Sequence, residues 1–186
     1  MIITISGVPG SGKTSVGKIL AERLGMPFYS VGKMRGKLAM ERGLTLDELN
    51  ALGEKDKTTD TGVDDYQREL GQKQDNFVIE GRLSWYFIPH SFKIYLDCEP
   101  AEAARRILAS QAERPDEKLP PTVEKTRQWL DKRLASDKRR YAAIYGVDYQ
   151  DQKNYDLVLN TTDSKNPEET ADRLSAILRP RLDAQT

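Results

Sequence analysis

The chain reads Gly7-Val8-Pro9-Gly10-Ser11-Gly12-Lys13-Thr14 directly after an apolar run, residues 2–5, and directly before a segment with helical apolar spacing. A strand, a glycine-rich loop and a helix in this order form a phosphate-binding loop, in which backbone N–H groups and the helix dipole face phosphate oxygens. Lys13 would reach the β- and γ-phosphates of ATP, and Thr14 would bind Mg²⁺. The alternative is a plain turn that matches the fixed positions of this motif by chance. We therefore predict a nucleoside triphosphate site.

Short apolar runs alternate with amphipathic segments along the chain, which is typical of βα units around a parallel sheet. We expect strands at residues 2–6, 27–30, 77–80, 92–97 and 156–160. We expect helices at residues 13–24, 33–42, 46–53, 60–74, 100–110, 122–145 and 167–179, with Thr45 and Thr122 as N-caps. The predicted fold class is α/β, with a P-loop NTPase core whose five-stranded parallel sheet is flanked by helices.

Two stretches depart from this alternation. Residues 31–75 carry successive helix signals without a strand, so we expect an inserted helical lobe between the second and third strands. Residues 111–121 are polar, contain prolines and separate two helices, which is typical of a mobile lid. For each stretch the alternative is a surface insertion without a role. We expect one domain over residues 1–186 that includes both insertions.

The composition argues against a dedicated nucleic-acid binder, because Lys plus Arg and Asp plus Glu number 29 each and the net charge is zero. The charge is unevenly spread, however. Residues 41–80 hold five basic and eleven acidic residues, whereas residues 105–140 hold eleven basic and six acidic ones. The second region could receive phosphates. With 38% hydrophobic residues, the chain can bury one core.

The single cysteine, Cys98, excludes an internal disulfide, and its apolar surroundings in the sequence favour a structural role. The only histidine, His90, lies in a loop and is more typical of an exposed residue than of a catalytic one. No apolar run approaches the roughly 18 residues of a membrane span, and the chain starts without a basic leader. We therefore expect a cytoplasmic monomer with neither membrane nor nucleic-acid partners.

Glu80-Gly81-Arg82 directly follows the apolar residues 77–79, so the carboxylate should emerge at the carboxyl edge of a buried strand. Ligands of open α/β sheets bind at this edge. Glu80 would hold Mg²⁺ through water, opposite Thr14, and the planar guanidinium of Arg82 suits a phosphate. Asp97, which ends the next strand, is a second candidate for the carboxylate on the metal side. The alternative for both acids is that they only cap a strand end.

Arg133, Asp137 and Arg140 fall on one stripe of the long helix expected at residues 122–145. From composition alone, a solvated ladder of surface ion pairs is the favoured interpretation of such a stripe. The aromatic stretch at residues 84–87 would either wall the acceptor pocket or pack in the core, and the sequence does not favour one over the other.

Four motifs in order together resemble the cytidylate kinases, and most of all their short archaeal-type branch. The motifs are the P-loop, Glu80-Gly81-Arg82, the strand 93–97 with its Pro-Ala-Glu helix start, and residues 136–141 followed by Tyr145-Gly146-Val147-Asp148. The resemblance runs from Met1 to about Leu178. It implies a nucleoside monophosphate (NMP)-binding lobe at residues 31–75, a lid at 111–121, and transfer of a phosphoryl group from ATP to CMP or dCMP.

The resemblance also implies roles for individual residues. Arg82 would contact the acceptor phosphate, and Arg133, Asp137 and Arg140 would meet the phosphate and sugar of the acceptor. Arg35 would be a phosphate ligand from the helical lobe, and Arg114 in the lid would reach the donor phosphates on closure. Lys13, Mg²⁺ and the arginines would offset charge during transfer, and no general base is needed because the acceptor phosphate is already anionic.

The sequence departs from the family in two places that bear on specificity. Leu83 stands where bacterial cytidylate kinases commonly have an aspartate that helps to read the base, and Ala103 stands where the family often has an arginine, which leaves Arg106 as the remaining match. A P-loop kinase for another NMP, a nucleoside or another small molecule is therefore the first alternative. A nucleotide-dependent switch or an RNA-associated ATPase fits less well, because the sequence has no Asn-Lys-x-Asp run and no aromatic platform among basic residues.

Overall fold

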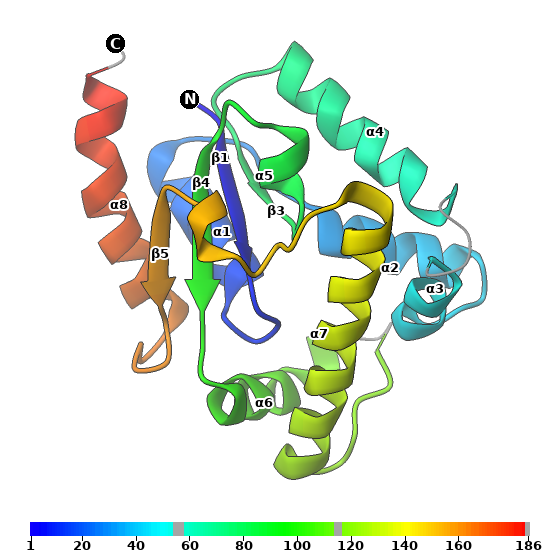
Figure 1. Ribbon diagram of the computed structural model, residues 1–186. Coiled ribbons are helices and arrows are strands. Elements are labelled where there is room, and N and C mark those ends of the chain that lie inside the picture. The colour runs from blue at the N-terminus through cyan, green and yellow to red at the C-terminus, as the bar shows by residue number, and fades with distance from the viewer. Residues whose placement is uncertain (54–57, 114–116, 185–186) are drawn as a thin grey trace.

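A parallel five-stranded sheet forms the centre of the protein, in the order β2-β3-β1-β4-β5 (Figure 1). The structure is a computed structural model and describes residues 1–53, 58–113 and 117–184. Each pair of neighbouring strands is parallel. The strands are β1 (Ile3–Gly7), β2 (Phe28–Ser30), β3 (Val78–Glu80), β4 (Phe92–Asp97) and β5 (Leu157–Asn160). The predicted sheet is thus confirmed, with strand ends displaced by no more than one residue.

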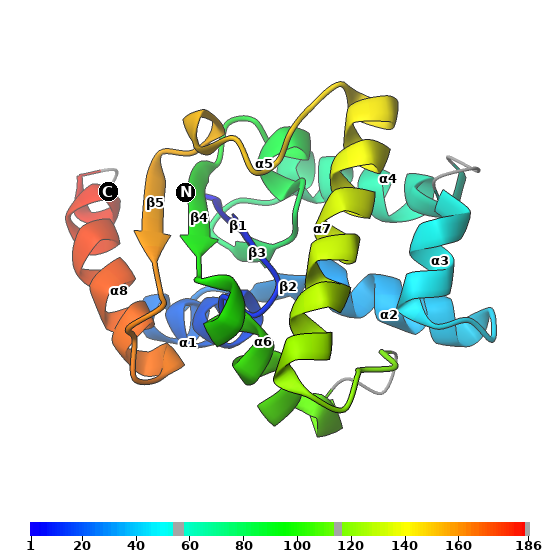
Figure 2. The same ribbon diagram turned by 60° about the horizontal axis from the view of Figure 1, so that its bottom comes forward.

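Helices cover both faces of this sheet and extend beyond one edge. Figures 1 and 2 show α8 beside β5 at one edge and α2, α3 and α4 beyond the opposite edge, with α7 running between these three helices and the sheet. The helices are α1 (Lys13–Leu24), α2 (Val31–Glu41), α3 (Leu46–Gly53), α4 (Thr58–Lys73), α5 (Ser84–Phe87), α6 (Pro100–Ala109), α7 (Val123–Tyr145) and α8 (Pro167–Asp183). Short 3₁₀ helices lie at Gln111–Glu113 and Gln152–Asn154.

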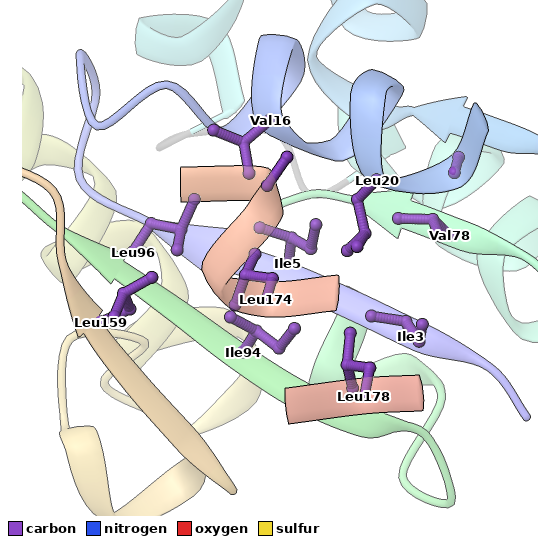
Figure 3. Close-up of a cluster of buried hydrophobic side chains, with 12 residues drawn as sticks. Ile3, Ile5, Val16, Leu20, Val78, Ile94, Leu96, Leu159, Leu174 and Leu178 are labelled. Carbon is purple, nitrogen blue, oxygen red and sulfur yellow. The ribbon is translucent and has the colours of Figure 1, made fainter. Parts of the chain in front are cut away.

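The two faces of the sheet are buried in separate clusters, because successive side chains of a strand point to opposite faces. Ile3 and Ile5 of β1 pack with Leu20 of α1 and Leu174 of α8 (Figure 3). On the other face, Ile79 packs in a cluster with aromatic side chains. That cluster includes Phe77, Trp85, Phe87, Tyr141 and Tyr149. Burial on both sides explains why the strands read as near-continuous apolar runs.

The aromatic stretch at residues 84–87 belongs to this second cluster. Trp85 and Phe87 are buried in it, whereas Tyr86 is exposed. The stretch forms the short helix α5, which the sequence did not predict because a single turn is too short to show helical periodicity. Of the two interpretations that the sequence left open, core packing describes Trp85 and Phe87.

The ends of several helices follow from local chemistry. Thr45 and Glu48 form a capping box before α3: the N–H of Glu48 donates to Oγ1 of Thr45 (3.2 Å), and the N–H of Thr45 donates to Oε2 of Glu48 (2.7 Å). Thr122 caps α7 by accepting from the N–H of Lys125. Both predicted N-caps are confirmed. The prediction for α8 ended too early, at residue 179, because the helix continues through Pro180 for one further turn.

The two predicted insertions have distinct structures. In the described part of residues 31–75, α2, α3 and α4 follow one another with no strand between them. Residues 111–113 form a 3₁₀ turn and residues 117–121 have no regular structure, whereas Arg114 lies outside the described residues. Across residues 1–53, 58–113 and 117–184, we find no helix whose length and apolar character would allow it to span a membrane. Cys98 is buried and His90 is exposed, as expected.

Candidate active site

The glycine-rich loop between β1 and α1 has a backbone that requires its glycines. Gly7, Gly10 and Gly12 have φ angles of 142°, 82° and 85°, which side chains rarely allow. A Cβ atom on Gly7 would also lie 2.0 Å from the carbonyl oxygen of Leu96, and one on Gly10 would lie 2.6 Å from that of Ala103. The loop is therefore pressed against β4 and α6, and substitutions at Gly7 or Gly10 would distort it.

Lys13 lies across this loop. Its Nζ donates a hydrogen bond of 2.6 Å to the carbonyl oxygen of Val8. Lys13 is also the first residue of α1, so its charge lies at the positive end of the helix dipole. Positive charge and the helix N-terminus together form an environment suited to an anion such as a phosphate.

Glu80 ends β3 beside this loop and meets hydroxyl groups from two other elements. Oγ1 of Thr14 donates to Oε1 of Glu80 at 3.3 Å, and Oγ of Ser30 donates to the same oxygen. Glu80 is 4% exposed. A carboxylate and two hydroxyls are hard oxygen donors, so this set fits Mg²⁺ chemically. The expected meeting of Glu80 with Thr14 is observed, and Ser30 is an additional member that the sequence analysis missed.

Asp97 makes the contact expected of a strand-end cap. Its Oδ1 accepts a hydrogen bond of 2.9 Å from the N–H of Cys98. The geometry at this position is therefore that of the structural alternative, and Glu80 is the better candidate for the carboxylate on the metal side.

Arg82, which follows β3, comes together with Asp137 and Arg140 of α7. Nε of Arg82 lies 2.8 Å from Oδ2 of Asp137, and Nη2 of Arg140 lies 3.2 Å from Oδ1 of the same carboxylate. Arg140 also donates to the hydroxyl of Tyr141 at 3.0 Å. Asp137 and Arg140 are 1% and 2% exposed, so the interpretation of this stripe as a solvated ladder of ion pairs is wrong.

The charges in this cluster stabilise one another. Burial alone would lower the pKa of Arg82, but the carboxylate of Asp137 raises it above its ordinary value, as does the nearby Tyr149. The pKa of Arg140 is likewise raised, against the effect of burial, by Tyr141 and Asp137. Both guanidinium groups therefore stay charged at neutral pH. Tyr149 is fully buried, and its ring centroid lies 6.0 Å from the Arg82 guanidinium.

Asn50 connects the helical segment to this cluster. Its Oδ1 accepts hydrogen bonds from Nη2 of Arg35 at 3.0 Å and from Nη1 of Arg140 at 2.9 Å. Burial lowers the pKa of Arg35, and the positive charge of Arg140 lowers it further. Arg35 thus shares an acceptor with Arg140 of the cluster, and its role as a phosphate ligand stays a prediction. Asn50 was not among the predicted site residues, although it shares the buried stripe of α3 with Leu46 and Leu49, where a polar residue is unusual.

Arg133 has different partners from Arg140, although both lie on α7. Nη1 of Arg133 lies 2.5 Å from Oε1 of Glu117, and its guanidinium lies 5.0 Å from the ring centroid of Trp129. The side chains of Arg133 and Glu117 are 8% and 4% exposed. The indole N–H of Trp129 donates to Oδ2 of Asp47 on α3 at 2.7 Å. Arg133 is therefore fixed by Glu117 of the predicted lid and by Trp129, which itself bonds Asp47 of the helical segment.

The two departures from the cytidylate kinase pattern have clear structural settings. Leu83 is 5% exposed and packs in the aromatic cluster, so it serves the core. Ala103 is 2% exposed and its backbone lies against Gly10 of the glycine-rich loop. Because the side chain at position 103 is buried in a cluster with Ile107 and Leu130, an arginine there would displace its neighbours.

The chain matches the sequence model of the cytidylate kinase-like family over residues 2–163. It is 36% identical over 162 residues to a cytidylate kinase from Methanococcoides burtonii, covering 87% of this chain and 88% of that protein. It is 40% identical over 163 residues to a cytidylate kinase from Natronomonas pharaonis, covering 87% of this chain and 81% of that protein.

Solved structures with the same fold are more distant in sequence. An uncharacterized protein from Eubacterium ventriosum superposes with a TM-score of 0.70 at 17% identity, covering 96% of this chain and 98% of the other. A shikimate kinase from Aquifex aeolicus superposes with a TM-score of 0.58 at 22% identity, with 98% of both chains covered. At these identities the likeness supports the P-loop kinase fold alone.

Proposed function

The chain belongs to the cytidylate kinase-like family, and we propose that it transfers the γ-phosphoryl group of ATP to CMP or dCMP, giving ADP and CDP or dCDP. An oxygen of the acceptor phosphate forms the new bond to the γ-phosphorus, and the bond from that phosphorus to the β–γ bridging oxygen breaks. The observation that carries the proposal is the buried cluster of Arg82, Asp137 and Arg140 at the sheet edge that also holds the glycine-rich loop. Guanidinium groups held beside a phosphate loop suit a second anionic substrate.

The donor side is formed by the glycine-rich loop. In this proposal its N–H groups and Lys13 bind the β- and γ-phosphates, and Thr14, Glu80 and Ser30 hold Mg²⁺, Glu80 through water. When bound, Mg²⁺ would neutralise charge on the phosphate oxygens. Lys13 would exchange the carbonyl of Val8 for phosphate oxygens, which are stronger acceptors because they are charged.

The acceptor side is formed by side chains from separate elements. Arg82 and Arg140 would bind the acceptor phosphate while Asp137 keeps both guanidiniums in place, and Arg35 and Arg133 would complete the positive surroundings. This arrangement accounts for catalysis by alignment and charge stabilisation alone. The charges are placed before the substrate arrives, so little reorganisation is needed during transfer.

The helical segment 31–75 is proposed as the NMP-binding lobe and residues 111–121 as the lid. Asn50 and Trp129 support this division, because each joins α7 to α3 of the lobe by a hydrogen bond. Arg114, outside the described residues, is proposed to reach the donor phosphates from the lid. We further propose that the protein is a monomer that acts on the nucleotides of the cytoplasm.

The test is a coupled assay of ADP release with CMP, dCMP, UMP, AMP and GMP as acceptors. We expect the highest kcat/KM for CMP or dCMP. Because Leu83 replaces a residue that reads the base in bacterial relatives, a preference for another monophosphate is the specific alternative. Such a preference, or activity on a nucleoside only, would replace the cytidylate assignment. ATP hydrolysis that rises with RNA and with none of the monophosphates would replace it by an RNA-associated ATPase.

A further inference from the structure

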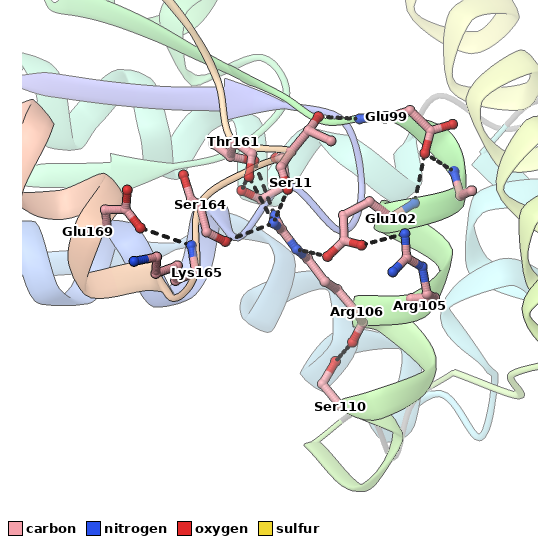
Figure 4. A network of polar contacts seen from close by, with 12 residues as sticks. Ser11, Glu99, Glu102, Arg105, Arg106, Ser110, Thr161, Ser164, Lys165 and Glu169 are labelled. Carbon is pink, nitrogen blue, oxygen red and sulfur yellow. Dashed lines mark hydrogen bonds and ion pairs between the residues drawn. The ribbon is translucent and has the colours of Figure 1, made fainter.

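Arg106 of α6 binds the segment that follows β5 (Figure 4). Its Nη2 donates to the carbonyl oxygens of Thr161, Thr162 and Ser164 at 2.8, 3.0 and 3.3 Å. Nη1 donates to the hydroxyl of Thr161 at 3.2 Å, and Nε donates to Oε1 of Glu102 at 2.8 Å. All three guanidinium nitrogens of Arg106 thus bind protein acceptors, which is an unusually complete set for a side chain that is only partly buried.

Thr161 carries this contact to the phosphate loop. Its Oγ1 lies within hydrogen-bond distance of the carbonyl oxygens of Ser11, at 3.2 Å, and Asp97, at 3.0 Å. The N–H of Thr161 also donates to the carbonyl of Asp97 at 2.9 Å. Thr161 and Ser11 are each 1% exposed. A continuous set of polar contacts therefore runs from α6 through the segment after β5 to the middle of the glycine-rich loop.

The same helix touches the loop a second time. Ala103 lies one turn before Arg106, and its backbone is so close to Gly10 that a Cβ on that glycine would lie 2.6 Å from the Ala103 carbonyl oxygen. Glu99 caps the start of α6 by accepting from the N–H groups of Ala101 and Glu102. Because α6 is fixed against the loop at Gly10 and tied to it through Arg106 and Thr161, its position and the shape of the loop depend on each other.

We propose that Arg106 is a positioning residue of the donor site, which holds residues 161–164 and, through Thr161, the phosphate loop in the shape that binds ATP. Arg106 does so from within the protein and does not contact the nucleotide. Lysine cannot replace it. The planar guanidinium of arginine reaches Glu102 and the carbonyl groups of residues 161–164 at the same time, whereas the compact ammonium group of lysine cannot. This inference rests on one part of the proposed function, namely that the glycine-rich loop binds ATP. It does not depend on the identity of the acceptor.

Arg105 provides a matched control. It is the preceding residue on α6 and pairs with the other carboxylate oxygen of Glu102 at 2.9 Å, but its side chain is 63% exposed. It carries the same charge on the same helix and pairs with the same carboxylate, but within the part of the chain that the structure describes no hydrogen bond joins it to residues 161–164. Loss of a positive charge from α6 is therefore common to R105A and R106A, whereas loss of the contacts to the segment 161–164 is specific to R106A.

The experiment measures the dissociation constant of Mg²⁺–ATP by titration calorimetry without an acceptor, and the KM values for ATP and CMP, for R105A, R106A, R106K and T161V. We expect R106A and R106K to weaken ATP binding about tenfold to a hundredfold, the usual effect of losing hydrogen bonds to a charged group. The KM for CMP should stay within a factor of two. R105A should bind ATP like the unsubstituted protein, and T161V should weaken ATP binding in the same direction as R106A.

A double-mutant cycle decides whether Arg106 acts through Thr161. If it does, R106A with T161V will weaken ATP binding less than the product of the two single effects. Independent effects would mean that Arg106 acts on the nucleotide directly and would overturn the proposal. Unchanged ATP binding in R106A and R106K would also overturn it. Equal losses for ATP and CMP would do so as well, because they indicate general destabilisation.

If R106A does not fold, R106K and T161V test the same contact between Arg106 and Thr161. ATP binding by a protein that does not phosphorylate CMP would refute the proposed function but not this inference.

Discussion

Nε of Arg82, just after β3, lies 2.8 Å from Oδ2 of Asp137 in the middle of α7. The other carboxylate oxygen of Asp137 pairs with Arg140, so one buried carboxylate holds two guanidinium groups. Two like charges close together in the interior are tolerated only if an opposite charge lies between them. Asp137 therefore organises the cluster that we propose for the acceptor phosphate, and its charge matters more than its shape.

Substituting Asp137 by Asn tests this directly. The amide keeps the size of the side chain but removes the charge, leaving two buried guanidiniums uncompensated, which typically costs about 3–5 kcal/mol of folding free energy. We expect D137N to have a lower free energy of unfolding in urea and a KM for CMP raised at least tenfold, with a smaller change for ATP. D131N, at an exposed position of the same helix, is the control. A D137N protein with the stability and KM values of the unsubstituted enzyme would contradict the role given to Asp137.

Lys13 is expected to matter for catalysis and little for folding. Its Nζ bonds the carbonyl of Val8 in a loop whose shape is set by glycines, so K13A should retain the fold. Loss of a charge that stabilises the transferring group should lower kcat about a hundredfold or more. The circular dichroism spectrum and melting temperature measure the fold, and the coupled assay measures kcat. The control is K18A, on the exposed side of α1. Full activity of K13A would exclude the loop from the mechanism.

Glu80 should determine the Mg²⁺ requirement. Its carboxylate accepts from Thr14 and Ser30, and replacing it with Gln keeps an oxygen acceptor but removes the charge that attracts the cation. Supporting carboxylates around metals usually contribute about tenfold to a hundredfold in affinity. We therefore expect E80Q to need at least tenfold more Mg²⁺ for half-maximal rate, with activity partly restored at high Mg²⁺. A D97N variant should keep the normal Mg²⁺ requirement, since Asp97 caps its own strand end. The reverse result would assign the metal side to Asp97.

The fold and the donor site could be predicted because their signals are local in the sequence. The strand, loop and helix around Lys13 are contiguous, and Glu80 emerges at the same sheet edge because parallel strands share a carboxyl edge. Sequence reasoning could therefore place Glu80 near Thr14 without knowing how the helices pack. The short helix α5 could not be found in this way, because one turn shows no helical periodicity and its aromatic residues fit a pocket wall as well as the core.

The contacts inside the acceptor cluster were beyond sequence reasoning, because they depend on how α3 packs against α7. Asn50 reads as an ordinary polar residue until its buried position and its two arginine donors are known. Glu117 reads as one acid in a polar lid, although its carboxylate is buried against Arg133. Identifying Arg133, Asp137 and Arg140 required the family resemblance, since charged residues at helical spacing are usually solvated.

Asn50 is expected to affect the acceptor and not the donor. N50A removes the oxygen that both Arg35 and Arg140 bind, so each guanidinium loses a fixed partner while its charge remains. We expect the KM for CMP to rise about tenfold or more, given the usual contribution of hydrogen bonds to charged groups, and the dissociation constant for ATP to stay unchanged. N50D, which restores an acceptor with a charge, should recover part of the loss. Equal effects of N50A on ATP and CMP would separate Asn50 from the acceptor site.

Asp64 should make stability depend on pH. Burial raises the pKa of this carboxyl above its ordinary value, although Tyr145 donates a hydrogen bond to it and Arg68 and Arg35 lie near. The folded protein therefore binds the proton more tightly than the unfolded chain, in which an Asp titrates near about 3.9. The stabilising contribution of the protonated form is complete below the unfolded value and is lost as the pH rises through the folded value. At neutral pH the ionised carboxylate thus weakens the fold.

Replacing Asp64 by Asn removes this penalty, because the amide oxygen can still accept from Tyr145 without carrying a charge. We expect D64N to have a higher free energy of unfolding than the unsubstituted protein at pH 7. The difference should shrink toward zero as the pH falls below about 4, because Asp64 is then protonated in both the folded and the unfolded state. Urea unfolding at a series of pH values measures the difference. The control is D131N, at an exposed position of α7, for which we expect no gain in the free energy of unfolding at pH 7 that disappears on acidification. If D64N were instead less stable at pH 7 and equal at low pH, the carboxylate would be stabilising in its ionised form, and its hydrogen bond from Tyr145 would outweigh its burial.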